Sequence, residues 1–492
     1  MGFMIREIDT DCTFSSALTV DALSQAIPTA TITQVIAQHG VGEVRHRRLT
    51  MTLVVWLIIA LHLYPTVAID GVLRKLARGL RFIWPDPSIA LPGASAIAYR
   101  RSQLGARPIV AMFQQVCQPI ATPDTRGAFV FGLRAMAVDG TTEDVPDTVA
   151  NAAAFGRHTS ARGASAFPQL QGVYLIECGT HVVVDAGFWP CHTSERIGGF
   201  RVLRSVGRGM LLMWDRGFHD FDMVVAVRRR GAHVLSRLPA NVKPLPLRTL
   251  PDGSVLAYLL PSEDGRRRQG ERILVRVITY TITDPTLPGY GEEHRVITTL
   301  LNPRLASAHE VACAYHERWE IEIVIDEIDT HQRLVGRTLR SLTPVGVIQE
   351  LYGILLAHYA VRVLMHEAAL LADVDPDRLS FVGALEIVRD AVPEFQMVAP
   401  AQQRQLYERM LHDIAAKLLP ERRARVNARV VKRKMSNFKL KRPEHAQPPK
   451  PQGSFRDAVV VQAPLVLELP HPYLMPQGNV TLELRQYVPA RI

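Results

Sequence analysis

Three acidic residues lie where ligands for a divalent cation would be expected. Asp139 follows an apolar run that predicts a buried strand, and Asp215 follows a second run of the same kind. Glu322 lies within residues 315–329, where charged and apolar residues alternate without Gly or Pro, and this pattern predicts a helix. Carboxylate oxygens are suitable ligands for Mg²⁺ or Mn²⁺. Two such ions about 4 Å apart can activate a nucleophile and stabilise the leaving oxygen of an in-line displacement.

Further polar side chains share the predicted helix with Glu322. At about 100° per residue, Tyr315, Arg318, Glu322 and Asp329 fall on one stripe that is about 60° wide. Such a stripe can hold a phosphate and a metal ion together, although a charged stripe taken alone is more often a solvated face. Asp185 also ends a predicted strand, and the sequence does not separate it from the other acids.

The elements that must position these residues are indicated by changes of pattern along the chain. Residues 1–125 predict helices, and after them the pattern changes to buried strands in the order β-β-β-α-β-α-β. Ligands in α/β sheets bind at the carboxyl ends of strands, which is where the first two acids are expected. We expect a helical domain at 1–125, of a kind that often binds DNA, and a catalytic domain at 126–345 with a β-rich insertion at 240–305. A helical region at 346–445 and a tail without an assigned role at 446–492 follow.

The charge balance favours a polyanionic partner. The chain has 57 basic and 47 acidic residues, which gives a net charge of +10. Arg266, Arg267 and Arg268 lie at a predicted hairpin tip, where they would either contact a nucleic-acid backbone or only solubilise a loop. The basic run at 421–442 is interpreted either as a solvated tail or, in part, as an amphipathic helix that contacts DNA.

Several classes of protein are disfavoured by the same sequence. Five cysteines without a CxxC pair make a zinc cage or a disulfide framework unlikely, and they fit a reducing cytoplasm. The first 20 residues carry three acids and no apolar core, so we expect no signal peptide. Residues 49–69 are uncharged, but Pro65 and several polar residues interrupt them. They predict a buried helix of roughly 15 residues rather than a membrane span of about 20.

These residues resemble the DDE transposases of the insertion sequence 4 family. The family signature is Tyr, two residues, Arg, three residues, Glu, six residues and Lys, and Tyr315, Arg318 and Glu322 match it in type and spacing. The two Asp motifs of the family match at residues 138–141 and 215–218. A β-rich insertion between the second Asp and the Glu is also a family feature.

The resemblance implies an α/β fold, with an RNase H-like mixed sheet flanked by helices, the β-rich insertion, an all-helical N-terminal domain and a helical C-terminal region. Asp139, Asp215 and Glu322 are implied to bind two Mg²⁺ ions, for which Mn²⁺ can substitute. These ions would direct water at the transposon-end phosphodiester, and then direct the freed 3′-hydroxyl at the other strand or at target DNA. Tyr315 and Arg318 would hold the phosphate.

The implied partner is double-stranded DNA, both as terminal inverted repeats and as target. A homodimer on the DNA, a cytoplasmic location at the nucleoid and no membrane association are expected with it. Two further interpretations stay open: an RNase H-like nuclease without strand transfer, and a DNA-binding protein derived from a transposase. A membrane protein and a carboxylate-pair glycosidase are weaker alternatives, and a glycosidase leaves the Tyr and Arg of the stripe without a purpose.

One residue departs from the family signature. Asp329 stands at the position of the Lys, so an anion replaces a cation that would contact phosphate beside an acidic cluster. At an effective dielectric constant of about 20, we expect this change to cost roughly 1–3 kcal/mol. The sequence therefore predicts an impaired copy, in which restoring Lys at this position raises strand transfer.

Overall fold

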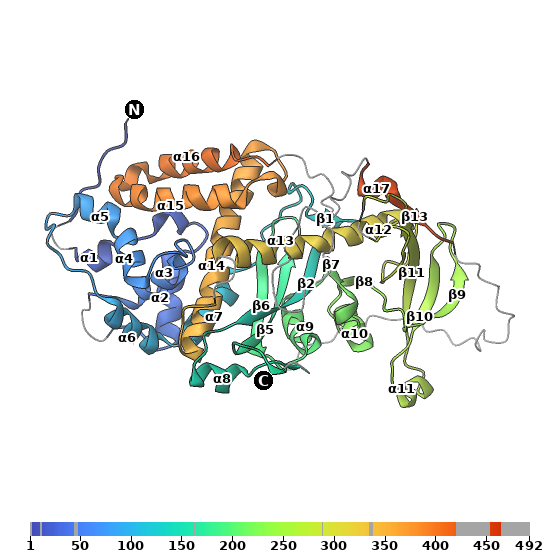
Figure 1. Cartoon of the computed structure of the whole chain (residues 1–492). Helices are drawn as coiled ribbons and strands as arrows, with labels where there is room; N and C mark the ends of the chain where they lie inside the picture. Colours follow the sequence, from blue (N-terminus) through green and yellow to red (C-terminus); the bar gives the residue numbers. More distant parts are fainter. Residues whose placement is uncertain are drawn as a thin grey trace, which may run out of the picture.

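The computed structural model describes residues 2–9, 12–43, 48–160, 163–287, 289–333, 338–419 and 453–463. A helical body lies at one end of the molecule, a mixed sheet in the middle and further strands at the other end (Figure 1). The basic run at 421–442 and most of the tail after 446 lie outside the described residues.

The N-terminal part is helical, as the sequence predicts. Its helices are α1 to α7, at Phe14–Ala17, Thr29–Gln38, Met51–Ala60, Ile69–Leu76, Arg78–Ile83, Ala94–Leu104 and Arg107–Val116. Helix α3 begins after Thr50, whose side chain accepts a hydrogen bond from the backbone N–H of Leu53. Every residue of α3 except Thr52 is buried, so the uncharged stretch at 49–69 supplies a core helix.

Three further helices, α14 (Pro344–Ala372), α15 (Phe381–Met397) and α16 (Gln403–Ala415), pack on this body (Figure 1). The backbones of α5 and α15 are in contact at Gly79, where an added Cβ would lie only 2.1 Å from the carbonyl oxygen of Pro393. Pro393 has no N–H, so the carbonyl of Arg389 one turn earlier lacks its helical donor. The hydroxyl of Tyr64 donates to that carbonyl at 3.0 Å. The N-terminal helices and α14–α16 therefore share one core.

Helix α14 is long and apolar enough to cross a membrane, judged by length and composition alone. However, 78% of its most apolar window is buried inside the protein. It is the one such helix among the described residues. Burial of this kind is what the core helix of a folded domain shows.

The central strands form a mixed sheet in the order β6-β5-β2-β7-β8. Strand β5 runs antiparallel to both of its neighbours, β2 and β6. Strands β2, β7 and β8 run parallel to one another. Helices α8 (Val149–Phe155), α9 (Glu195–Val202) and α10 (Phe221–Arg229) connect them. The strands span Leu133–Asp144 (β2), Gln169–Glu177 (β5), Val183–Pro190 (β6), Met210–Trp214 (β7) and His233–Arg237 (β8).

The β-rich segment expected at 240–305 continues this same sheet, because β12 pairs antiparallel with β8. The hairpin tip predicted at 265–268 is confirmed, because it connects the antiparallel strands β10 and β11, and it contains a short helix, α11 (Asp264–Arg268). Part of the tail also returns to this sheet, where β13 (Val459–Val461) follows α17 (Phe455–Ala458) and pairs with β11. The strands between β8 and the tail are Leu245–Thr249 (β9), Val255–Leu259 (β10), Ile273–Ile282 (β11) and Glu293–Thr298 (β12).

Candidate active site

Asp139 and Asp215 lie level with one another on neighbouring parallel strands. The register pairs Ala137 of β2 with Met213 of β7, and each Asp follows two residues later. Asp215 directly follows β7, as predicted, and its carboxylate accepts a hydrogen bond from the N–H of Gly217 at 2.7 Å. The prediction that Asp139 ends its strand is wrong, because β2 continues to pair with β5 as far as Asp144.

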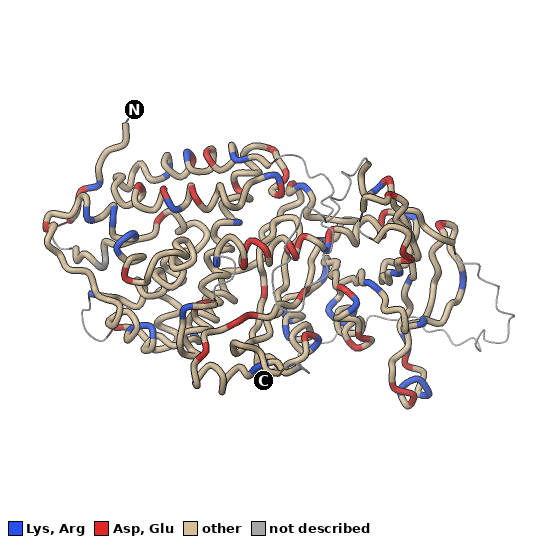
Figure 2. Tube along the Cα trace, viewed as in Figure 1, with Lys and Arg blue, Asp and Glu red and all other residues tan. Residues whose placement is uncertain are grey.

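The segment that carries Glu322 is helical, but it changes between α-, 3₁₀- and π-helical geometry. Helix α12 (Ala308–His316) begins at a capping box, in which Ser307 and Glu310 satisfy each other's backbone N–H groups. A 3₁₀ turn, helix α13 (Glu320–Asp326) and a π-helical stretch (Glu327–Gln332) follow it. Acidic residues recur along this path (Figure 2). The expected helix over 315–329 is therefore present, but it starts earlier and widens near its end.

Arg318 connects Glu322 with Asp139. Its Nη1 donates to Oδ2 of Asp139 and its Nη2 donates to Oε1 of Glu322, each at 3.3 Å. The guanidinium is 8% exposed, and it lies 5.9 Å from the ring centre of Tyr315. The hydroxyl of Tyr315 in turn donates to the carbonyl of Trp214, next to Asp215, at 3.3 Å. The structure thus brings together the five residues expected from the two Asp motifs and the signature.

Electrostatics around Asp139 indicate a lack of positive charge. Burial raises the pKa of Asp139 to about 6, and the charges of Asp215 and Glu322 add to the increase. The N–H of Gly140, which donates to Asp139 at 2.8 Å, and the charge of Arg318 oppose it. Asp139, Asp215 and Glu322 together form a carboxylate donor set of the kind that Mg²⁺ or Mn²⁺ binds. The residues therefore fit a divalent metal ion, and Arg318 is a fixed cation beside two of them.

Two other groups of side chains in the described part of the chain have donor atoms that all lie within 4.8 Å of one another. One is His158, Cys191 and His192, and the other is His181, Glu320 and Asp377. Neither group includes Asp139, Asp215 or Glu322. The three predicted ligands are therefore more widely spaced than these groups, and Arg318 lies between two of them.

Asp185, which the sequence leaves as an alternative to the other acids, has a structural partner. It lies inside β6 and is buried. Arg204 donates to both of its oxygens, at 2.8 and 2.7 Å, and the hydroxyl of Ser205 donates to one of them at 2.7 Å. These bonds satisfy the carboxylate. Asp185 therefore ties β6 to the turn after α9.

Glu195 lies beside the site and was missed by the sequence analysis. It is the first residue of α9, and a Cβ added to Gly140 would lie 2.7 Å from its Oε1. Gln171 donates to the same oxygen at 3.2 Å. Burial and the charge of Asp215 raise the pKa of Glu195. The sequence holds no clear signal for it, because Glu is common in the first turn of a helix.

Asp329 does not join the stripe that the sequence predicts. Its carboxylate accepts from Nη1 of Arg333 at 3.1 Å, and the same nitrogen donates to Glu143 of β2. The stripe assumed 3.6 residues per turn throughout, whereas the backbone is π-helical from Glu327 and turns less with each residue. Asp329 consequently belongs to a separate ion-pair cluster, Glu143–Arg333–Asp329.

The stability of the folded protein is expected to depend on pH through Asp329. Burial and the nearby Glu143 raise its pKa from 3.8 to about 7. The folded state therefore binds this proton more tightly than the unfolded state. The resulting stability is fully present below about pH 4 and is lost as the pH rises through 7. Asp329→Asn should be more stable than the wild type at pH 8, by on the order of 1–2 kcal/mol after discounting for solvent screening, with the gap closing towards pH 5.

Urea unfolding at several pH values measures this difference. Asp264→Asn is the control, since that acid lies in the α11 tip, is 79% exposed and does not contact the Glu143–Arg333–Asp329 cluster. Its unfolding curves should follow those of the wild type. Parallel curves for wild type and Asp329→Asn between pH 5 and 8 would contradict the assignment.

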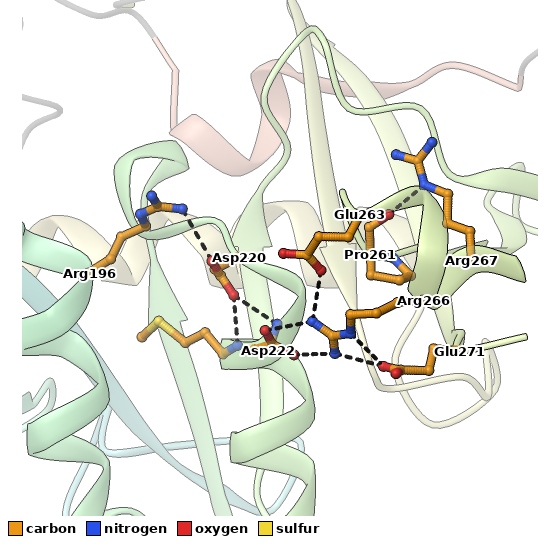
Figure 3. Close-up of polar contacts among 9 residues, drawn as sticks. Arg196, Asp220, Asp222, Pro261, Glu263, Arg266, Arg267 and Glu271 are labelled. Atoms are coloured by element: carbon orange, nitrogen blue, oxygen red, sulfur yellow. Dashed lines mark hydrogen bonds and ion pairs between the residues drawn. The ribbon is translucent and has the colours of Figure 1, made fainter. Parts of the chain in front are cut away.

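The predicted arginines at the α11 tip are mostly engaged within the protein (Figure 3). Arg266 donates to both oxygens of Asp222 in α10, at 2.9 and 2.6 Å, and also pairs with Glu263 and Glu271. These contacts hold the tip of the β-rich segment against the central part of the protein. A bidentate pair of this kind leaves Arg266 few donors for a phosphate.

The other two arginines of the tip differ from Arg266. The Nε of Arg267 donates to the carbonyl of Pro261 at 2.6 Å, and its Nη1 reaches Asp264 at 3.3 Å. Arg268 is exposed, and within the described ranges no hydrogen bond or ion pair is recorded for it. Of the three predicted phosphate contacts, Arg268 is the most available.

The site has the arrangement expected of a DDE-type transposase, with two Asp residues on neighbouring parallel strands, a Glu on a helix and an Arg between them. Two family models show this class of protein. The model for the Transposase DDE domain matches residues 131–360, and that for the Insertion element 4 transposase N-terminal region matches residues 17–114. The chain belongs to the insertion element 4 family of DDE transposases. It is accordingly a DNA transposase.

Two relatives, both transposases by name, agree with this assignment. Transposase InsG for insertion sequence element IS4 of Escherichia coli (strain K12) is 28% identical over 415 residues, which is 82% of this chain and 89% of the relative. A putative transposase InsZ of the same organism is 24% identical over 221 residues, which is 44% of this chain and 70% of the relative. A solved piggyBac transposase synaptic complex with hairpin DNA matches 82% of this chain and 84% of its own at 12% identity, with a TM-score of 0.41.

Proposed function

We propose that Asp139, Asp215 and Glu322 are the catalytic residues of this transposase and that they bind two Mg²⁺ ions, which Mn²⁺ can replace. The position of Arg318, held 3.3 Å from both Asp139 and Glu322, carries the proposal. A buried cation between two acids indicates a cluster that needs positive charge. When bound, divalent ions supply that charge and activate the attacking oxygen while stabilising the leaving one.

The side chains of the protein bind and orient the DNA. Arg318 presents a planar fork to the phosphate at the transposon end, and Tyr315 places a hydroxyl beside it. Water first attacks this phosphodiester and releases a 3′-hydroxyl. That hydroxyl then attacks the other strand or the target DNA, so that one P–O bond forms as another breaks.

The partner in this proposal is double-stranded DNA, both as terminal inverted repeats and as target, held by a homodimer at the nucleoid in the cytoplasm. Arg268, with Arg266 and Arg267 after release from their acids, would contact the backbone. An RNase H-like core is supported by the sheet, in which β2 contains Asp139 and its parallel neighbour β7 ends directly before Asp215.

An end-cleavage assay tests the proposed function. DNA that carries the inverted repeats flanking the gene should be nicked at the transposon end with Mg²⁺ or Mn²⁺, but not with EDTA. Joined products should then form with target DNA. Nicking without joined products would instead indicate a nuclease, and binding without nicking would indicate a DNA-binding protein that has lost the chemistry.

Asp329→Lys should raise strand transfer several-fold over the wild type. The change removes one of two acids that share Arg333 and adds a cation beside Glu143, which leaves more positive charge near the DNA. Joined product per nicked end, measured on a gel, reports this step.

Asp329→Asn separates the two effects of that substitution, because it removes the anion without adding a cation. An equal gain for both variants would assign the effect to lost repulsion, and a gain for Lys alone would assign it to the new cation. No gain for either variant would contradict an impaired wild type.

A further inference from the structure

A buried polar network lies behind the helix that carries Glu322. Its members come from four separate segments: the turn between β5 and β6, α13 with the π-helical stretch, α14, and the 3₁₀ turn Pro376–Arg378. The network consists of His181, Glu320, Glu327, His358, Arg362 and Asp377, of which all but Asp377 are buried. The proposed mechanism uses none of them.

Glu327 and Arg362 form the centre of this network. Nε of Arg362 donates to Oε2 of Glu327 at 3.0 Å, and its Nη2 donates to the other oxygen. The Nε2 of His358 lies 3.0 Å from Oε2 of Glu327. Glu327 is therefore bound by two side chains of α14. Glu327 is also the first residue of the π-helical stretch, and such stretches occur frequently at functional sites.

His181 extends the network to the N-terminal end of α13. Its Nε2 lies 2.6 Å from Oε2 of Glu320 and 3.0 Å from Asp377, and Nη2 of Arg362 lies 2.6 Å from its Nδ1. The φ of His181 is +62°, a strained conformation for a residue with a Cβ. The surrounding structure thus stabilises an unfavourable backbone that places the imidazole between these groups.

The donor atoms of His181, Glu320 and Asp377 are close enough for a metal ion, but their surroundings favour a proton. Burial and Arg362 lower the pKa of His181, yet Asp377 and Glu320 outweigh them and raise it well above its usual value. A metal ion at Nε2 would have to displace this proton beside the guanidinium of Arg362. The cluster is therefore a hydrogen-bond network.

We propose that this network positions Glu322 for catalysis, an inference that rests on the proposed function. Glu320 and Glu327 lie two residues before and five residues after Glu322 on the same helical path, and both face inward. Glu322 faces the other way, is 47% exposed and meets Arg318. Two buried anchors fix both the rotation and the axial position of the helix, and these set where the Glu322 carboxylate lies relative to Asp139 and Asp215.

A positioning role differs from simple stabilisation in what it predicts. Replacing a buried ion pair often changes stability little or even favourably, so stability alone is a weak reason for such a network. Residues that orient metal ligands typically contribute about 10–100-fold to metal affinity or activity. The relevant readouts are thus kcat and metal affinity of the folded protein.

Glu327→Gln in the full-length chain is the central test, because it keeps the volume and removes the charge that Arg362 requires. For end cleavage we expect kcat to fall about 10–100-fold, with KM for the DNA end unchanged. Mn²⁺ affinity, measured by electron paramagnetic resonance without DNA, should fall as well.

Glu350→Gln is the matched control. Glu350 is 2% exposed, against 6% for Glu327, and it accepts hydrogen bonds from the N–H groups of Arg340 and Ser341 rather than from the helix of Glu322. We expect this variant to lower the melting temperature while kcat per folded molecule and Mn²⁺ affinity stay at wild-type values. Equal kcat for Glu327→Gln and Glu350→Gln would overturn the inference.

Two further variants keep the outcome decisive. If Glu327→Gln does not fold, His181→Asn replaces it, since Asn tolerates positive φ but does not reach Glu320. The same expected losses and the same overturning result apply to it. Glu322→Gln, run in parallel, separates the two proposals: if it still cleaves, the proposed function fails, whereas its inactivity beside an active Glu327→Gln refutes only the network.

Discussion

Asp215→Asn should lower end cleavage by at least about 10³-fold while leaving the fold and DNA binding intact. An amide oxygen can still accept the N–H of Gly217, which Asp215 binds at 2.7 Å, so the turn after β7 keeps its cap. What is lost is one negative charge beside Asp139 and Glu322. A divalent ion then has one neutral ligand and a smaller net attraction, which weakens activation of the attacking oxygen.

A neighbouring residue provides a matched control for this prediction. Asp220 also caps a helix, with Oδ1 accepting from the N–H of Asp222 at 2.8 Å and of Met223 at 3.3 Å. Asp220→Asn makes the same chemical change five residues away and should leave cleavage within about twofold of the wild type. Nicked product per time, with binding followed by gel shift, measures both variants. Equal activity of Asp215→Asn and the wild type would remove Asp215 from the reaction.

The sequence predicts which acidic residues lie near the site better than it predicts where their strands end. Asp215 was placed correctly because β7 is a short apolar run that ends where its strand ends. For Asp139 the same rule fails, since apolar residues stop at Val138 while hydrogen bonding with β5 continues for six more residues. Apolarity reports burial, whereas a strand ends where its partner ends, and that depends on a distant segment.

Other differences have the same non-local origin. Pairing between β12 and β8, which joins the β-rich segment to the central sheet, is set by register and not by composition. Glu195 reaches the site because α9 packs over Gly140, a contact that no spacing in the sequence indicates. Asp329 pairs with Arg333 outside the predicted stripe, where the backbone changes to a π-helix at Glu327.

Arg318→Met should change two properties of the protein in opposite directions. In the protein without DNA, the guanidinium lies 3.3 Å from two of the proposed ligands, Asp139 and Glu322, and repels any added cation. At an effective dielectric constant of about 20, like charges at such distances repel by several kcal/mol before screening. Removing the charge should therefore raise Mn²⁺ affinity by about tenfold or more, while Met still packs against Tyr315.

Cleavage should fall about 10²–10³-fold in the same variant, because the phosphate at the transposon end loses a preorganised charged donor. Arg318→Lys separates charge from geometry, since it keeps the cation but lacks the planar fork. It should bind Mn²⁺ as the wild type does and yet cleave more slowly. If Mn²⁺ affinity instead falls together with cleavage in Arg318→Met, the guanidinium holds the carboxylates together and does not stand in for the metal ions.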